Sequence, residues 1–102
     1  MVSWDTYVLT LMEELQGLGM RVPEEFSLVG IDDMAAARRS TPQLTSYRFP
    51  MDEMGRSAIE LLIQQIEDRS RPVRHLQING QLIERGSCAA ATSNQLSVIG
   101  DQ

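Results

Sequence analysis

Two adjacent carboxylates, Asp32 and Asp33, are the side chains in this sequence whose position best suits chemistry. They end an apolar run, residues 27–31, that is typical of a strand buried in a parallel sheet. Open α/β sheets bind their ligands at the carboxyl ends of the strands, which is where Asp32 would lie. There it could contact a bound small molecule, or it could cap a short helix over residues 34–39. The residues alone favour neither reading.

Catalytic and metal-binding chemistry find little support elsewhere in the chain. All nine basic residues are arginine, so a P-loop, a Schiff-base enzyme and a phosphoacceptor site would each lack their lysine. His75, the single histidine, lies at an alternating position of an expected strand, as a surface residue would. Cys88 has no neighbouring base. An enzyme that used Asp32 as an acid, base or metal ligand would need further groups. We therefore expect no catalytic residue, no bound metal and no cofactor.

The composition describes one domain, or part of one, from a reducing compartment such as the cytoplasm. At 102 residues, with 42% hydrophobic residues, the chain can bury a modest core. It has no apolar run near the roughly 20 residues that span a bilayer, and no secretory signal. One cysteine cannot form an internal disulfide. The net charge of −5 argues against direct nucleic-acid binding.

Apolar spacing predicts a helix over residues 5–18, before the central strand. Its stripe consists of Val8, Leu11, Met12, Leu15 and Leu18. Leu9 lies off that stripe and would suit a partner surface. After the central strand, the Arg38-Arg39 pair ends a short helical stretch, and it could form either a phosphate site or a solvated interface face.

The second half of the chain predicts a strand over 44–49 and a helix over 51–68 that begins after Pro50. Gly55 costs stability in a helix, so we expect it to mark a close contact between helix and sheet. Asn79-Gly80 lies between alternating segments at 73–78 and 81–85, a pattern that predicts a hairpin. Residues 89–102 are small and polar, and we expect a flexible tail.

Longer motifs carry a family resemblance. Residues 19–33, Gly-Met-Arg-Val-Pro-Glu-Glu-Phe-Ser-Leu-Val-Gly-Ile-Asp-Asp, resemble the Gly-Leu-x-Val-Pro-x-Asp-Val-Ser-Val-Val-Gly-Phe-Asp-Asp signature of the lactose/galactose repressor (LacI/GalR) family. Collinear matches follow at Thr-Pro-Gln-Leu-Thr-Ser (41–46), Pro-Met-Asp-Glu-Met-Gly (50–55) and Leu-Ile-Glu-Arg-Gly-Ser (82–87).

The resemblance implies an α/β fold, part of the C-terminal lobe of a type I periplasmic-binding-protein-like domain. A mostly parallel sheet would be flanked by helices and followed by a C-terminal hairpin. Residues 1–88 would form the C-terminal portion of an effector-binding and dimerisation lobe. The family's helix-turn-helix headpiece and N-terminal lobe have no counterpart here, so we expect a fragment of such a regulator. In the full-length regulator, only the headpiece that is missing here would contact DNA.

Site residues carry over from the family position by position. Asp32 resembles the carboxylate that binds the effector, commonly a sugar or purine. Asp5 resembles the aspartate of an Asn-Asp pair, with Trp4 in place of the ligand-touching asparagine and able to stack on a ring. Met51 lies where the family often has an apolar cleft residue. The implied homodimer interface consists of Leu9, Glu13, Arg38, Arg39, Ser40 and Thr41.

We therefore expect an effector-sensing and dimerisation fragment of a transcriptional regulator. Its partners would be a small-molecule effector, in the complete two-lobed protein, and a second copy of the chain. A fragment of a periplasmic sugar-binding protein with the same fold is the alternative, which the missing signal sequence disfavours.

Overall fold

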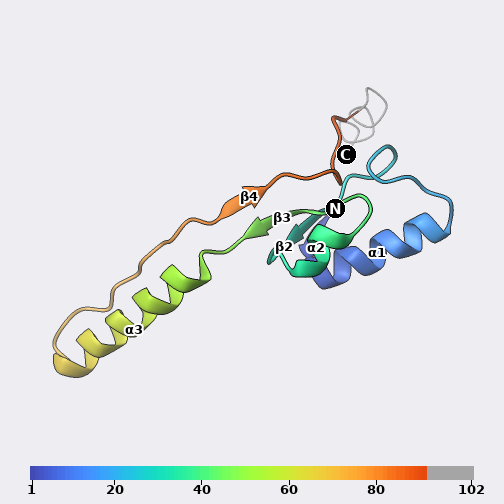
Figure 1. The fold of residues 1–102 in the computed structure, drawn as a ribbon. Coiled ribbons are helices and arrows are strands. Elements are labelled where there is room, and N and C mark those ends of the chain that lie inside the picture. The colour runs from blue at the N-terminus through green and yellow to red at the C-terminus, as the bar shows by residue number, and fades with distance from the viewer. Residues whose placement is uncertain (92–102) are drawn as a thin grey trace.

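The computed structural model describes residues 1–91 (Figure 1). The expected tail over 89–102 therefore lies mostly outside the described residues. Strands and helices follow in the order β1 (Val2–Trp4), α1 (Asp5–Gly17), β2 (Val29–Ile31), α2 (Ala35–Arg39), β3 (Thr45–Arg48), α3 (Met51–Glu67) and β4 (Gln81–Ile83). Within the described part of the chain, no helix is both long enough and apolar enough to cross a membrane.

One four-stranded sheet has the order β1-β2-β3-β4. The first three strands are parallel, with Trp4 opposite Ile31 and Ile31 opposite Tyr47. The last strand, β4, pairs antiparallel with β3 and places Leu82 opposite Tyr47. The mixed, mostly parallel sheet that the resemblance implied is confirmed. Strand β1 was not expected, because three residues give too short a pattern to read.

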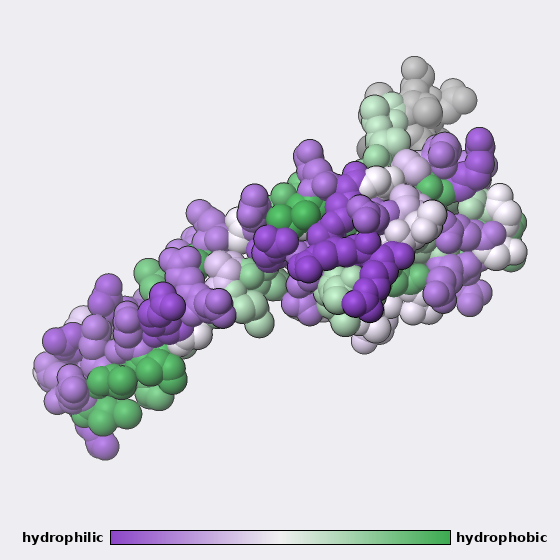
Figure 2. All heavy atoms as spheres, viewed as in Figure 1, coloured by the Kyte–Doolittle hydropathy of each residue, from purple (hydrophilic) through white to green (hydrophobic). Residues whose placement is uncertain are grey.

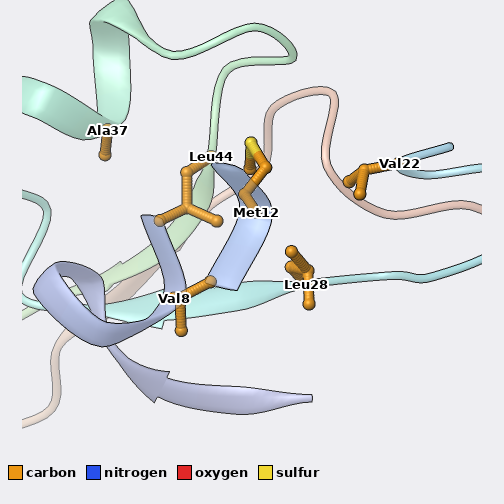
Figure 3. Close-up of a cluster of buried hydrophobic side chains, with 6 residues drawn as sticks. All are labelled: Val8, Met12, Val22, Leu28, Ala37 and Leu44. Carbon is orange, nitrogen blue, oxygen red and sulfur yellow. The ribbon is translucent and has the colours of Figure 1, made fainter. Parts of the chain in front are cut away.

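A small core joins α1 and α2 to the sheet (Figure 3). Its buried side chains are Val8, Met12, Val22, Leu28, Ala37 and Leu44. Val8 and Met12 of the predicted stripe are buried, and Leu11 and Leu15 pack against the core, so these four residues are confirmed as a packing face. Leu18 was also expected on this stripe, but it lies beyond the end of α1 and is exposed. Leu9 lies at the margin of this core and is partly buried.

Helix α3 forms an arm that projects away from the sheet together with the extended chain that returns from it (Figure 1). The helix is present as predicted, but none of its residues is buried. The radius of gyration is 19.1 Å, against about 13 Å for a compact chain of 100 residues. The apolar stripe of α3 is therefore open to solvent, as the hydrophobic atoms on the arm in Figure 2 show.

Two local predictions for this arm are wrong. A Cβ atom at Gly55 would meet nothing within 4 Å, so this glycine marks no contact between helix and sheet. Residues 73–80 are extended but form no strand, and β4 pairs with β3 instead of folding back on them. The Asn79-Gly80 pair forms no hairpin turn, because β4 pairs with β3 instead. The Gly80 amide also bonds to this strand, donating a hydrogen bond to the Tyr47 hydroxyl at 2.7 Å.

Candidate functional site

The carboxyl ends of β1, β2 and β3 meet at one edge of the sheet, and Asp32 follows β2 directly at that edge. The Asp32 amide donates to the Tyr47 carbonyl at 2.9 Å, which ties the turn to β3. Both Asp32 and Asp33 have positive φ, at 113° and 50°. Aspartate tolerates this region better than most residues because its short side chain can bond to nearby backbone. The turn sends the two carboxylates into different surroundings, one exposed and one buried.

Asp32 does not cap the following helix. Met34 is the N-cap residue of α2 and makes no side-chain cap bond. Its amide instead donates to Asp5 Oδ2 at 2.7 Å. The capping alternative for Asp32 is therefore wrong, because Met34 occupies the N-cap position and no side chain makes the cap hydrogen bond of α2.

Asp5 is fully buried beneath the turn that follows β2 and holds this turn in place. Besides the Met34 amide, it accepts a hydrogen bond from Ser46 Oγ at 2.7 Å, through Oδ1. Gly30 makes room for it, since a Cβ atom at this position would overlap Asp5 Oδ1. With both oxygens engaged inside the protein, Asp5 holds the turn after β2 to α1 and β3, and it presents no free atom to a ligand.

A hollow of about 360 Å³ lies over this edge, and we call it the edge hollow. Its lining consists of Trp4, Asp5, Thr6, Tyr7, Ile31, Asp32 and Met34. Three of the four expected effector residues therefore come together. Met51, the fourth, is exposed at the start of α3 and is not part of the lining.

Aromatic rings extend the site beyond the hollow. Trp4 is 51% exposed, and its ring lies 6.1 Å from the Phe49 ring, measured between centroids. Phe49 in turn meets Tyr47 edge to face at 5.4 Å. Sequence reasoning missed Phe49 and Tyr47 as members of the site, although both stand out as aromatic positions on one face of the predicted strand. The contact of Phe49 with Trp4 depends on strand order, which the sequence does not state.

Asp33 forms the second polar cluster of this edge, the Asp33 cluster, with three arginines. Its Oδ1 accepts from Arg85 at 2.6 Å. Its Oδ2 accepts from Arg48 at 2.7 Å and from Arg38 at 3.3 Å. Burial of the carboxyl raises its pKa, whereas the hydrogen bonds from the arginines lower it by more, so the pKa falls from 3.8 to about 2. Asp33 therefore stays ionised and links α2, β3 and the segment after β4.

The residues expected at a dimer interface divide between two places. A groove of about 410 Å³ between α1 and α2, the α1–α2 groove, brings Leu9 and Glu13 beside Arg39, Ser40 and Thr41. Gln16 also lines the groove and donates from Nε2 to the Thr41 carbonyl at 2.8 Å. Arg38 does not line this groove, because its side chain turns to Asp33.

Ligands for a metal ion do not gather in the described part of the chain, where no three His, Cys, Asp or Glu side chains are close enough to share one. His75 is exposed on the returning chain of the arm, and Cys88 is a free thiol.

The chain resembles known transcriptional regulators in both sequence and structure. The family model of the periplasmic binding protein-like domain matches residues 1–88. The HTH-type transcriptional repressor PurR of Vibrio vulnificus is 36% identical over 81 residues, which are 79% of this chain and 24% of that repressor. The chain spans about a quarter of the length of the curated relatives it matches.

Solved structures agree with the sequence matches. The transcriptional regulator CelR in complex with cellobiose superposes with a TM-score of 0.77 at 32% identity, over 83% of this chain and 26% of that one. A LacI family transcriptional regulator from Enterococcus faecalis with bound ribose gives a TM-score of 0.76 at 27% identity, over 87% of this chain and 33% of that one.

Proposed function

The chain belongs to the periplasmic binding protein-like family, as a portion of the sensing domain of a LacI/GalR-type regulator, and from this premise we propose that it forms one wall of an effector pocket. The observation that carries the proposal is the meeting of exposed Asp32 and half-exposed Trp4 in the edge hollow. Relatives and structural neighbours are named as transcriptional repressors and regulators rather than enzymes.

The chemistry of this wall suits a small polyhydroxylated ring. A carboxylate such as that of Asp32 accepts hydrogen bonds from hydroxyl groups, and charge-assisted bonds of this kind are the stronger ones. The flat face of Trp4 can cover the apolar side of a sugar ring. Two structural neighbours carry cellobiose or ribose, which supports a sugar as the effector class. Asp5 would act by holding Met34 and Ser46 in place, without touching the ligand.

The exposed arm is evidence that a second lobe completes the effector site. Its helix exposes Met54, Ile59, Leu62, Ile63 and Ile66. A helix of 17 residues gains most of its stability from packing such a face. We infer that a second lobe covers this stripe in the complete protein. Residues 1–50 and 81–88 would form the lobe that contains the sheet. Met51 would then lie at the mouth of the cleft between the lobes.

In such a two-lobed regulator, an effector that binds one lobe orientation better than another shifts the balance between them. The lobe orientation would set the DNA affinity of a headpiece, in the cytoplasm and without catalysis. The α1–α2 groove would contribute to a homodimer interface through Leu9 and Glu13, since an apolar side chain rimmed by charge suits such a surface.

Trp4 is the only tryptophan, so its fluorescence reports directly on the proposed site. Titration of the chain with cellobiose and with ribose should change this fluorescence only at high, millimolar sugar, because one wall makes few of the contacts of a closed cleft. Asp32→Asn should abolish the change, whereas Glu60→Gln, on the exposed arm, should not. Micromolar binding by the chain alone would contradict the need for a second lobe. A response unaffected by Asp32→Asn would contradict the site itself.

A further inference from the structure

The Asp33 cluster holds more positive charge than its carboxylate needs. Three guanidinium groups contact one carboxylate, so the ion pairs of this cluster comprise three positive charges and one negative charge, an excess of two positive charges (three minus one) within these pairs. The net charge of the whole chain is −5. Arg85 accounts for one of the three as a structural residue. Its side chain is 9% exposed, and it donates to both Asp33 and the Leu44 carbonyl. The excess charge is therefore carried at the surface by Arg38 and Arg48.

These two arginines are held side by side. Both donate to the same oxygen, Asp33 Oδ2, at 3.3 Å and 2.7 Å. Arg48 uses its Nε for this bond and Arg38 uses one terminal nitrogen. Both terminal nitrogens of Arg48 and the remaining donors of Arg38 thus lie beyond the carboxylate. The side chains are 46% and 57% exposed, so a solute can reach them.

We propose that Arg38 and Arg48 form a binding site for a phosphoryl dianion, such as the phosphate group of a small phosphorylated molecule. Guanidinium groups bind phosphate in forked, charge-assisted geometry. Two neighbouring arginines match the double charge of a phosphate, whereas a carboxylate ligand would neutralise only half of the excess. Asp33 fixes both side chains before binding, which lowers the entropic cost of ordering them.

This site stands apart from the proposed sugar site in its residues and in its test. It lies on the Asp33 cluster, which binds α2 to β3, whereas the edge hollow contains Asp32 and Trp4. The two sites share only the carboxyl edge of the sheet. Asp32→Asn should therefore leave phosphate binding intact, so that failure of one proposal does not decide the other.

The experiment is a titration of the chain with inorganic phosphate, followed by ³¹P NMR and by thermal unfolding, with sodium chloride at matched ionic strength. Phosphate should raise the unfolding temperature beyond the chloride control. Arg38→Gln should weaken phosphate binding about tenfold or more, because it removes a charge-assisted contact. Arg56→Gln, which removes one charge from the exposed arm, should not weaken it.

Arg48→Gln is the second variant, because Arg48 makes the shorter bond to Asp33 and its loss also weakens the fold. Its binding is read from ³¹P line widths at a temperature where circular dichroism shows it folded. The proposal is overturned if phosphate acts no differently from chloride, or if folded Arg38→Gln binds phosphate as the wild type does. A second titration uses glycerol phosphate in place of inorganic phosphate to identify the natural ligand. Tighter binding of glycerol phosphate would indicate a phosphate ester, and equal binding would indicate the free ion.

Discussion

The Asp5 carboxylate accepts a hydrogen bond from the Met34 amide at 2.7 Å, across 29 positions of the chain. This contact joins the first turn of α1 to the start of α2 and fixes the turn that contains Asp32 and Asp33. A second bond, from Ser46 Oγ, ties the same carboxylate to β3. One fully buried side chain thus sets the relative position of the three elements that carry the candidate site.

Asp5→Asn should destabilise the fold and disturb the edge hollow. Asparagine offers one acceptor oxygen where aspartate offers two, so either the Met34 amide or the Ser46 hydroxyl loses its partner. Hydrogen bonds to charged groups contribute about 1.5–3 kcal/mol each, and a loss in that range is expected in urea unfolding. Glu14→Gln, an exposed change on the same helix, is the control and should stay within about 0.5 kcal/mol of wild type. Equal stability of both variants would show that Asp5 is not a support.

Gly30→Ala and Gly55→Ala should have opposite effects. At Gly30 the new methyl group would overlap Asp5 Oδ1 and lie 2.7 Å from Leu44 Cδ2, so we expect a loss of about 3 kcal/mol or more. At Gly55 nothing lies within 4 Å, and alanine should stabilise α3 by about 1 kcal/mol. Circular dichroism during thermal unfolding measures both changes. Destabilisation by Gly55→Ala would mean that the helix packs closely at this point.

Acid should weaken the fold through Asp33. Its pKa is lowered from 3.8 to about 2 on folding, so the ionised, arginine-bound form stabilises the protein fully above pH 4. That contribution is lost as the pH falls from about 4 through about 2, because protons then bind the unfolded chain more readily than the folded one. Unfolding in urea at several pH values measures the loss.

Asp33→Asn provides the matched test of this pH dependence. It should cost about 3 kcal/mol at neutral pH, since it leaves the nearly buried Arg85 without its counter-charge. It should also flatten the stability profile between pH 4 and pH 2. If the variant kept the wild-type profile there, another carboxyl group would be responsible for the acid sensitivity.

Leu9→Glu should dissociate any dimer formed through the α1–α2 groove. The substitution places a charge beside Glu13 in the groove, where burial against a second copy would be costly. Light scattering after size-exclusion chromatography measures the mass of the wild type and the variant. Thr10→Glu, an exposed change on α1 outside the groove lining, serves as the control and should leave the mass unchanged. A wild-type monomer, or a dimer that withstands Leu9→Glu, would remove the groove from the interface.

The sequence by itself determined the local elements and the family. The spacing of Val8 and Met12 predicted the packing face of α1, and the motif ending in Asp32-Asp33 identified the sheet edge, because helix periodicity and strand ends are local properties. It also placed Trp4 and Asp32 together, through the resemblance. The first two features depend on residues close to one another in the chain, whereas Trp4 and Asp32 lie far apart in it and were linked only by the resemblance.

Only the tertiary structure decided how the two adjacent carboxylates divide their roles. Asp33 is buried among Arg38, which is near in the chain, and Arg48 and Arg85, which are distant. Asp5 is enclosed by Met34 and Ser46, which are 29 and 41 positions away. The same holds for α3, whose strong apolar stripe predicted packing that the described residues do not supply. Periodicity shows that a face is suited to burial, whereas the arrangement of the whole molecule decides what covers it.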